Sequence, residues 1–162
     1  MKTQAIISVF FGVVVVAALS AVWTDTSRTA QAHCQVPCGI YDDPARINYL
    51  KEDAATIAKA TAQINSLAGQ HGALAVNQSA RWVMTKENHA SHVITVMAEY
   101  FLAQRVKPVA PGTDGHDDYL KKLAEHHSVI VAAMKTKQSA DPATVEALNK
   151  AIDAIAPYYH KH

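Results

Sequence analysis

Residues 141–155 read D-P-A-T-V-E-A-L-N-K-A-I-D-A-I, and this stretch carries the clearest fold signal in the chain. Asp141 followed by Pro142 is typical of a helix N-cap and the first helical position. Apolar residues then recur at three- and four-residue spacing, at Val145, Leu148, Ile152, Ile155 and Tyr159. This period matches one face of an α-helix, so the stretch predicts an amphipathic helix with a single buried stripe.

The same three-four pattern occurs in three segments upstream. The first helix is expected to open with Asp43 as N-cap and Pro44 as first position, and to end at the glycines of residues 69–72. The second is expected over about 77–107 and the third over about 117–137. The expected inward positions are Ile47, Leu50, Ala54, Ile57, Ile64 and Leu67; Val83, Ala90, Val93 or Ile94, Met97 and Phe101; and Leu120, Leu123, His127, Ile130, Val131 and Met134.

Four helices with short connections predict an all-α fold, an antiparallel up-down four-helix bundle over residues 44–162. The sequence contains no convincing strand pattern and no internal repeat. A chain of 162 residues is long enough for one domain with its own core.

The N-terminal residues have the layout of a secretory signal. Lys2 precedes a nearly unbroken apolar run over residues 5–23, and Ala30 and Ala32 occupy the −3 and −1 positions of a cleavage site before His33. We therefore expect residues 1–32 to be a removed leader and the mature protein to be periplasmic or extracellular. The apolar run is also long enough to cross a bilayer once. A membrane anchor, or a cytoplasmic protein with a removed pro-segment, remains as an alternative.

Cleavage after residue 32 would leave equal numbers of acidic and basic residues, since the leader contains Lys2, Asp25 and Arg28. A formally neutral chain gives no basic stripe for nucleic acid and none for a membrane surface. We expect neither as a partner of the mature protein.

Both cysteines lie directly behind the expected cut, in the stretch A-Q-A-H-C-Q-V-P-C-G-I-Y at residues 30–41. A disulfide between Cys34 and Cys38 would close a very small loop at a chain end, where a cross-link constrains little of the unfolded ensemble. If the chain begins at His33, four donors gather within six residues. They are the new α-amine, the His33 imidazole and the two thiolates, and the amide nitrogen of Cys34 lies between the amine and the first sulfur.

Planar nitrogen and sulfur donors favour nickel or copper over zinc, which prefers a tetrahedron. Paired thiolates tend to reduce copper, so nickel is the better fit. The imidazole of His33 can take an axial position. Pro37 restricts the turn and permits a cis peptide bond, and Gly39 permits an unusual backbone. Tyr41 is close enough in sequence to stand over the open face of the metal.

These residues resemble the nickel-hook motif of nickel superoxide dismutase, H-C-x-x-P-C-G-x-Y, which is matched over residues 33–41. The resemblance implies a homohexamer of four-helix bundles, each with an N-terminal metal-binding hook at residues 33–43 and one nickel that cycles between Ni(II) and Ni(III). The activity implied is the antioxidant dismutation of superoxide to O2 and H2O2. A leader-processing peptidase is implied as a partner.

Carried over residue by residue, the resemblance makes His33, Cys34 and Cys38 the metal ligands. His33 would give the amine and the axial imidazole, Cys34 an amide nitrogen and a sulfur, and Cys38 a sulfur. His33 and Tyr41 would be the catalytic residues, with Tyr41 ordering solvent or an anion near the open axial side.

The sequence departs from the family pattern outside the ligands. Gln35 replaces an Asp, an extra residue lies within 41–44, and Asn48 aligns with a Glu that steadies the axial imidazole. The second helix looks shorter, so an Arg of the family that supports the site has no secure counterpart. These changes affect the orientation of the imidazole and leave the ligands themselves intact.

Three alternatives are left open by the residues. His89 and His92 lie three apart on one helical face, which permits a metal pair, although a lone H-x-x-H is a weak signal. A copper enzyme with an N-terminal His is a second class, disfavoured because that site is usually built on a β-scaffold. The third is a non-catalytic secreted bundle that binds nickel or copper or carries a Cys34–Cys38 disulfide.

Overall fold

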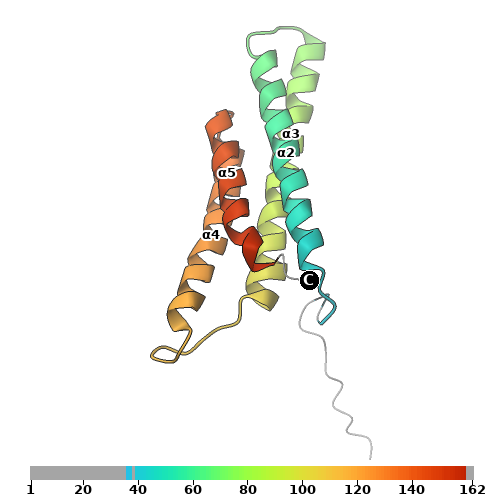
Figure 1. Ribbon diagram of the computed structural model, residues 1–162. Helices are drawn as coiled ribbons and strands as arrows, with labels where there is room; N and C mark the ends of the chain where they lie inside the picture. Colours follow the sequence, from blue (N-terminus) through green and yellow to red (C-terminus); the bar gives the residue numbers. More distant parts are fainter. Residues whose placement is uncertain (1–35, 38, 160–162) are drawn as a thin grey trace, which may run out of the picture. The chain divides into compact units, whose positions relative to one another are not determined.

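The protein is described by a computed structural model over residues 36–37 and 39–159, and this part of the chain consists of helices and the loops between them (Figure 1). His33, Cys34 and Cys38 lie outside the described residues. The helices are α2 (Asp43–Leu67), α3 (Ala73–Thr95), the π-helix η1 (Val96–Arg105), α4 (His116–Gln138), α5 (Pro142–Ile155) and the 3-10 turn η2 (Ala156–Tyr158).

The four long helices form the predicted antiparallel up-down bundle. Helix α2 packs against α3 and α5, and α4 packs against the same two helices, so successive helices are neighbours around the bundle. Figure 1 shows α2 beside α3 and α4 beside α5 as two hairpins. One core of buried side chains from α2, α3, η1, α4 and α5 joins them.

Helix α5 follows its sequence pattern closely. Asp141 caps it by accepting a hydrogen bond from the Ala143 N–H at 2.9 Å, and Pro142 is its first residue. All five predicted inward positions are buried, namely Val145, Leu148, Ile152, Ile155 and Tyr159. The regular spacing of large apolar residues was therefore sufficient to orient this helix.

The second predicted helix is longer than its pattern indicated. It begins at Ala73 rather than near residue 77, and it continues without a break into η1. The inward positions from Ala90 to Phe101 are confirmed, with Ile94 half-buried, but Val83 was wrong because its side chain is exposed. The first half of α3 thus carries apolar residues that the bundle does not cover.

Helix α4 is rotated about its axis relative to its predicted orientation. Leu120, Leu123 and Met134 were expected inside and are exposed, as is His127. The side chains buried instead are His126, Val129, Ala132, Ala133 and Thr136, and the predicted inward positions Ile130 and Val131 are half-buried. The bulkier apolar face was the wrong choice because close packing in a bundle favours small residues where helices approach each other.

His126 explains part of this rotation, because its imidazole is fully buried and hydrogen-bonded at both nitrogens. Nδ1 donates to the Lys122 carbonyl at 2.6 Å, so Nε2 accepts from the Tyr159 hydroxyl at 2.6 Å. Burial lowers the pKa of His126 below its usual value. The ring is therefore held neutral, and it ties α4 to the end of the chain that follows η2.

This buried neutral imidazole predicts a pH dependence of stability in the metal-free protein. Below about pH 6.5 the imidazole of this His is protonated in the unfolded chain but stays neutral in the native state. The unfolding free energy therefore decreases as the pH is lowered, by up to about 1.4 kcal/mol per pH unit. The loss stops once pH passes the lowered native pKa. Urea unfolding of His126→Asn at several pH values should show a shallower slope between pH 6.5 and 5 than the wild type. Equal slopes would show that another group causes the dependence.

The start of α2 differs from the sequence prediction by one residue. Asp42, not Asp43, is the N-cap, and its carboxylate accepts from the Ala45 N–H at 3.1 Å. Asp43 is the first residue of the helix, followed by Pro44. Because this turn contains two acidic residues, Asp42 can cap the helix while Asp43 binds other side chains.

Candidate metal centre

The predicted ligands belong to the hook at residues 33–43, called the loop below, of which the structure describes residues 36–37 and 39–43. The Val36–Pro37 peptide bond is cis, and the Ile40 N–H donates to the Pro37 carbonyl at 2.7 Å. Gly39 has a φ of 83°, a left-handed conformation that suits glycine. The expectations for Pro37 and Gly39 agree with this backbone, whereas His33, Cys34 and Cys38 themselves remain predictions.

Tyr41 is held between two residues of η1. Its ring meets the Tyr100 ring edge-on with centroids 5.8 Å apart. The Arg105 guanidinium carbon lies 4.3 Å from the centroid of the Tyr41 ring, which is a close cation–π contact. Tyr41, predicted to stand beside the metal, is thus fixed against the bundle at the point where the loop joins α2.

At this end of the bundle, the Asp43 carboxylate binds two side chains of η1. It accepts a hydrogen bond from the Tyr100 hydroxyl at 2.7 Å. Arg105 binds the same carboxylate through two nitrogens, with Nη2 at 2.6 Å and Nε at 2.9 Å from its oxygens. Burial, followed by the bond to Asp43, raises the pKa of Tyr100 far above its usual range. The bond to Asp43 likewise raises the pKa of Arg105. Tyr100 therefore stays a neutral donor and Arg105 a fixed cation.

The part of the loop between the two predicted cysteine ligands is contacted by Gln104. Its side-chain amide nitrogen donates to the Glu99 carbonyl at 2.9 Å and lies 3.4 Å from the Val36 carbonyl oxygen. The Gln104 side chain is almost fully buried, and its amide oxygen has no hydrogen-bond partner among the described residues. A buried acceptor beside the loop requires a donor, and the loop's own N–H groups or a bound water can supply one.

The sequence prediction missed Asp43, Gln104 and Arg105 as parts of this site. Asp43 was assigned to capping, and the other two lie in a segment interpreted as an ordinary α-helix. In the π-helix η1 the turns are wider, with hydrogen bonds between residues five apart, and such segments are frequent at functional sites. The widened turns place Tyr100 and Arg105, five residues apart, on one face.

Asn48, which aligns with a supporting Glu of the family, is exposed on α2. Gln35, the other noted departure, lies outside the described residues. The supporting carboxylate and cation that the structure does display near the loop are Asp43 and Arg105.

His89 and His92, considered above as a possible metal-binding pair, both contact the same carboxylate. Their Nδ1 atoms lie 2.6 and 2.7 Å from the two oxygens of Asp53, a buried carboxylate on α2. This arrangement ties α3 to α2. Over residues 36–37 and 39–159, no three or more His, Cys, Asp or Glu side chains are grouped in a way that could hold a metal ion.

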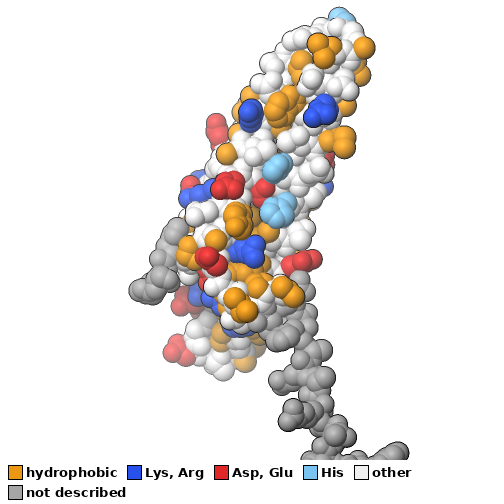
Figure 2. Space-filling model, turned by 90° about the vertical axis from the view of Figure 1, so that its right-hand side faces the viewer, with side chains coloured by type: hydrophobic (Ala, Val, Ile, Leu, Met, Phe, Trp, Pro, Cys, Tyr) orange, Lys and Arg blue, Asp and Glu red, His pale blue; other side chains and the backbone are white. Residues whose placement is uncertain are grey.

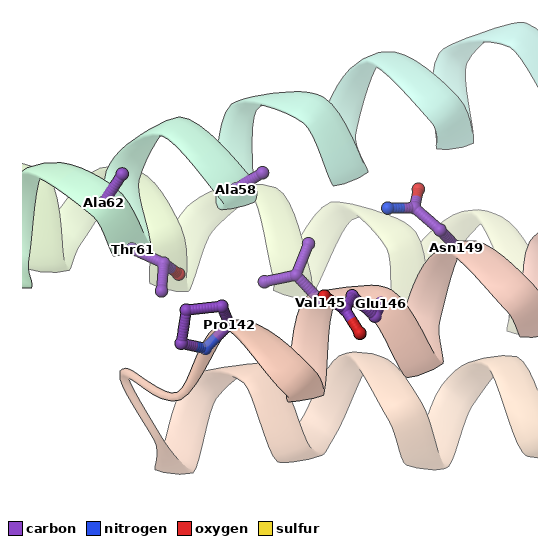
Figure 3. A pocket seen from close by; sticks show the side chains of 7 residues that line it. All are labelled: Ala58, Thr61, Ala62, Pro142, Val145, Glu146 and Asn149. Atoms are coloured by element: carbon purple, nitrogen blue, oxygen red, sulfur yellow. The ribbon is translucent and has the colours of Figure 1, made fainter.

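A hollow of about 240 Å³ lies far from the loop, between the middle of α2 and the start of α5 (Figure 3). Ala58, Thr61 and Ala62 line one side of it and Pro142, Val145, Glu146 and Asn149 the other. It begins roughly 20 Å along α2 from Asp43, at a rise of about 1.5 Å per residue. Its small, mostly apolar lining offers no set of metal ligands. Separately, none of the described helices combines the length and apolarity needed to cross a membrane.

Comparison with known proteins gives one match. The family model described as nickel-containing superoxide dismutase matches residues 28–162. No curated protein and no solved structure matches the chain. The matched region includes the whole H-C-x-x-P-C-G-x-Y stretch and all the described helices.

Proposed function

The chain belongs to the family of nickel-containing superoxide dismutases, and we propose that its nickel is bound by the loop that begins at His33 after removal of the leader. The enzyme is an oxidoreductase that converts superoxide to O2 and H2O2 with a nickel cofactor. The proposed ligands are the His33 amine and imidazole, the Cys34 amide nitrogen and thiolate, and the Cys38 thiolate. Nickel supplies the electron exchange with superoxide by alternating between Ni(II) and Ni(III).

The observation that supports this site most is that residues at the end of η1 contact the hook at two described points, Val36 and Tyr41. Gln104 contacts the carbonyl of Val36, and Arg105 and Tyr100 hold Tyr41. A metal site keeps a defined geometry when the residues around its ligands are held by a rigid support. The unpartnered buried oxygen of Gln104 fits a loop that turns inward at this point.

The contacts of Tyr41 support a role in ordering an anion or solvent beside the metal. Its ring is fixed by Tyr100, and the Arg105 cation lies against its face. Because the Asp43 carboxylate neutralises the Arg105 charge, this contact supports a role of Arg105 in fixing the ring rather than in attracting the anion. We propose His33 and Tyr41 as the catalytic residues on this basis.

We further propose that the mature protein is exported, because an A-x-A triplet ends immediately before His33 and follows an apolar run. One cut would then both complete export and create the α-amine ligand. The leader lies outside the described residues, so this proposal depends on the sequence pattern alone.

A homohexamer is supported by apolar side chains that the bundle leaves uncovered. Val36 and Ile40, on either side of the turn at Pro37, are 84% and 83% exposed. The outward face of α4 carries Leu120, Leu123 and Met134. Figure 2 shows hydrophobic side chains gathered over the end of the α2–α3 hairpin as well, where Leu74 is 73% exposed. Exposed patches of this kind commonly mark protein interfaces, here between copies of the same chain.

One preparation tests these proposals together. The full chain is expressed with its leader, and the purified product is analysed by mass spectrometry, metal analysis, light scattering and a superoxide-decay assay. We expect a polypeptide starting at His33, about one nickel per chain, a hexamer, and loss of activity when a chelator removes the metal. Active protein that retains its leader, or active protein with a Cys34–Cys38 disulfide and no nickel, would rule out the proposed site.

A further inference from the structure

Arg105 contacts two residues at the C-terminal end of the loop, and it uses a different part of its guanidinium group for each. The edge that carries Nε and Nη2 binds the Asp43 carboxylate. The flat face lies against the Tyr41 ring, 4.3 Å from its centroid. Arg105 is the last residue of η1, so these contacts join that helix to the loop and to the start of α2.

The two contacts constrain each other geometrically. A guanidinium group that binds a carboxylate through two nitrogens lies near the plane of that carboxylate. Asp43 itself is fixed as the first residue of α2 and by its bond from Tyr100. The plane of Arg105 is therefore set independently of the rest of the loop, and this plane supports the Tyr41 ring. A lysine could keep the charge here, but it has no flat group with which to form both contacts.

Gln104, the neighbour of Arg105, reaches the loop at Val36, between the two predicted cysteine ligands. One end of η1 therefore contacts the chain both before Pro37 and after Gly39. The Arg105 side chain is about 29% exposed and the Asp43 side chain 14%. The pair is thus sheltered enough to be stronger than a surface ion pair, and it is close enough to solvent for a charge to be tolerated.

We propose that Arg105 is the positioning residue of the metal-binding loop, acting through Asp43 and Tyr41 and without binding the metal itself. This inference rests on the proposed function of the loop. Nickel affinity and the geometry around the metal then depend on a residue at the end of η1. Residues that orient ligands in this way typically change metal affinity by about 10–100-fold when removed.

The test compares Arg105→Gln and Arg105→Lys with Arg81→Gln, which removes an exposed arginine elsewhere on α3. Nickel affinity is measured on correctly cleaved, reduced protein by competition with a chelator, and the oxidised protein is examined by electron paramagnetic resonance. We expect Arg105→Gln to bind nickel at least about 10-fold more weakly and to show altered nitrogen splitting in the spectrum of the oxidised metal. Arg105→Lys should lie closer to Arg105→Gln than to the wild type, and Arg81→Gln should match the wild type.

Two further measurements separate positioning from general stability. In metal-free protein with ring-labelled tyrosine, the Tyr41 resonances, assigned with Tyr41→Phe, should shift in Arg105→Gln and stay unchanged in Arg81→Gln. In an Arg105→Gln/Asp43→Asn double variant, nickel affinity should fall little further than in the single variants. Both substitutions remove the same Arg105–Asp43 interaction, so their effects should not add.

The outcomes distinguish this inference from the proposed function. Wild-type protein that binds no nickel overturns both. Wild-type protein that binds nickel, with Arg105→Gln equal to it in affinity and in the spectrum of the oxidised metal, overturns the role of Arg105 alone. A lower melting temperature with unchanged nickel affinity likewise assigns Arg105 a purely structural role.

Discussion

Protein with one additional alanine ahead of His33 is expected to bind nickel more than about 100-fold more weakly and to lose nearly all dismutase activity. The extra residue converts the α-amine of His33 into an amide, whose nitrogen must lose its proton before it can bind a metal. The imidazole and both thiolates remain, so the change removes one ligand and leaves every side chain in place. Loss of a direct ligand should exceed the 10–100-fold effects typical of residues that only orient ligands.

A reversible form of this variant gives the sharpest control. The alanine extension can be removed by an aminopeptidase, after which nickel binding and activity should return in the same sample. An alanine added after His162, at the other end of the chain, should have no effect. Full activity in the extended protein would mean that the amine is not a ligand, whichever protease removes the leader in the cell.

The sequence predicted the bundle well where apolar side chains were both large and regularly spaced. Helix α5 is such a case, because Val145, Leu148, Ile152 and Ile155 leave one rotation that buries them all. Helix α4 was placed wrongly because two faces compete in it. Its bulky residues, such as Leu123 and Met134, lie outside, and a face of His126 and small residues lies inside. Hydrophobic periodicity cannot rank those faces, since the choice depends on which helices approach closely.

The candidate site divides in a similar way. The proposed ligands, Pro37, Gly39 and Tyr41 could be named from the sequence because the chemistry of a processed N-terminus requires particular residues at short spacing, and the ligands themselves stay a prediction. Asp43 and Arg105 were not, because they lie 62 residues apart and meet only in the folded chain. The sequence did contain one hint, namely a second acidic residue before Pro44 that capping alone does not require.

The apolar residues of α4 that were wrongly predicted to be buried lie on its outward face. Had Leu120, Leu123 and Met134 been buried, the bundle would present a polar surface there. Their exposure leaves an apolar face with helical spacing, which is costly for a free monomer in water. The residues that misled the sequence prediction are therefore among those on which the proposed assembly with further copies of the chain depends.

Lys86→Met is expected to lower the unfolding free energy of the metal-free protein by about 3 kcal/mol, the largest stability effect that we predict for a single charged residue. Lys86 is almost fully buried on α3, and its ammonium group donates to three carbonyls at the end of α4. The acceptors are Thr136 at 2.6 Å, Lys137 at 3.0 Å and Ser139 at 2.8 Å. The carbonyls at a helix C-terminus lack partners within the helix and carry the negative end of its dipole, so a cation is well suited to them.

Two effects oppose each other in this variant, and their sizes decide the direction. Methionine has nearly the same shape and removes the cost of burying a charge, which can make the loss of a buried ion pair neutral when both partners are replaced. Here only the donor is replaced, and the carbonyls remain in place with at most partial access to water. Each unsatisfied acceptor costs about 1–3 kcal/mol, so the loss exceeds the gain. The melting temperature should fall by about 10 °C, whereas Lys150→Met, at an exposed position on α5, should change it little. A Lys86→Met protein as stable as the wild type would mean that water or a shift of the 139–141 turn satisfies these carbonyls just as well.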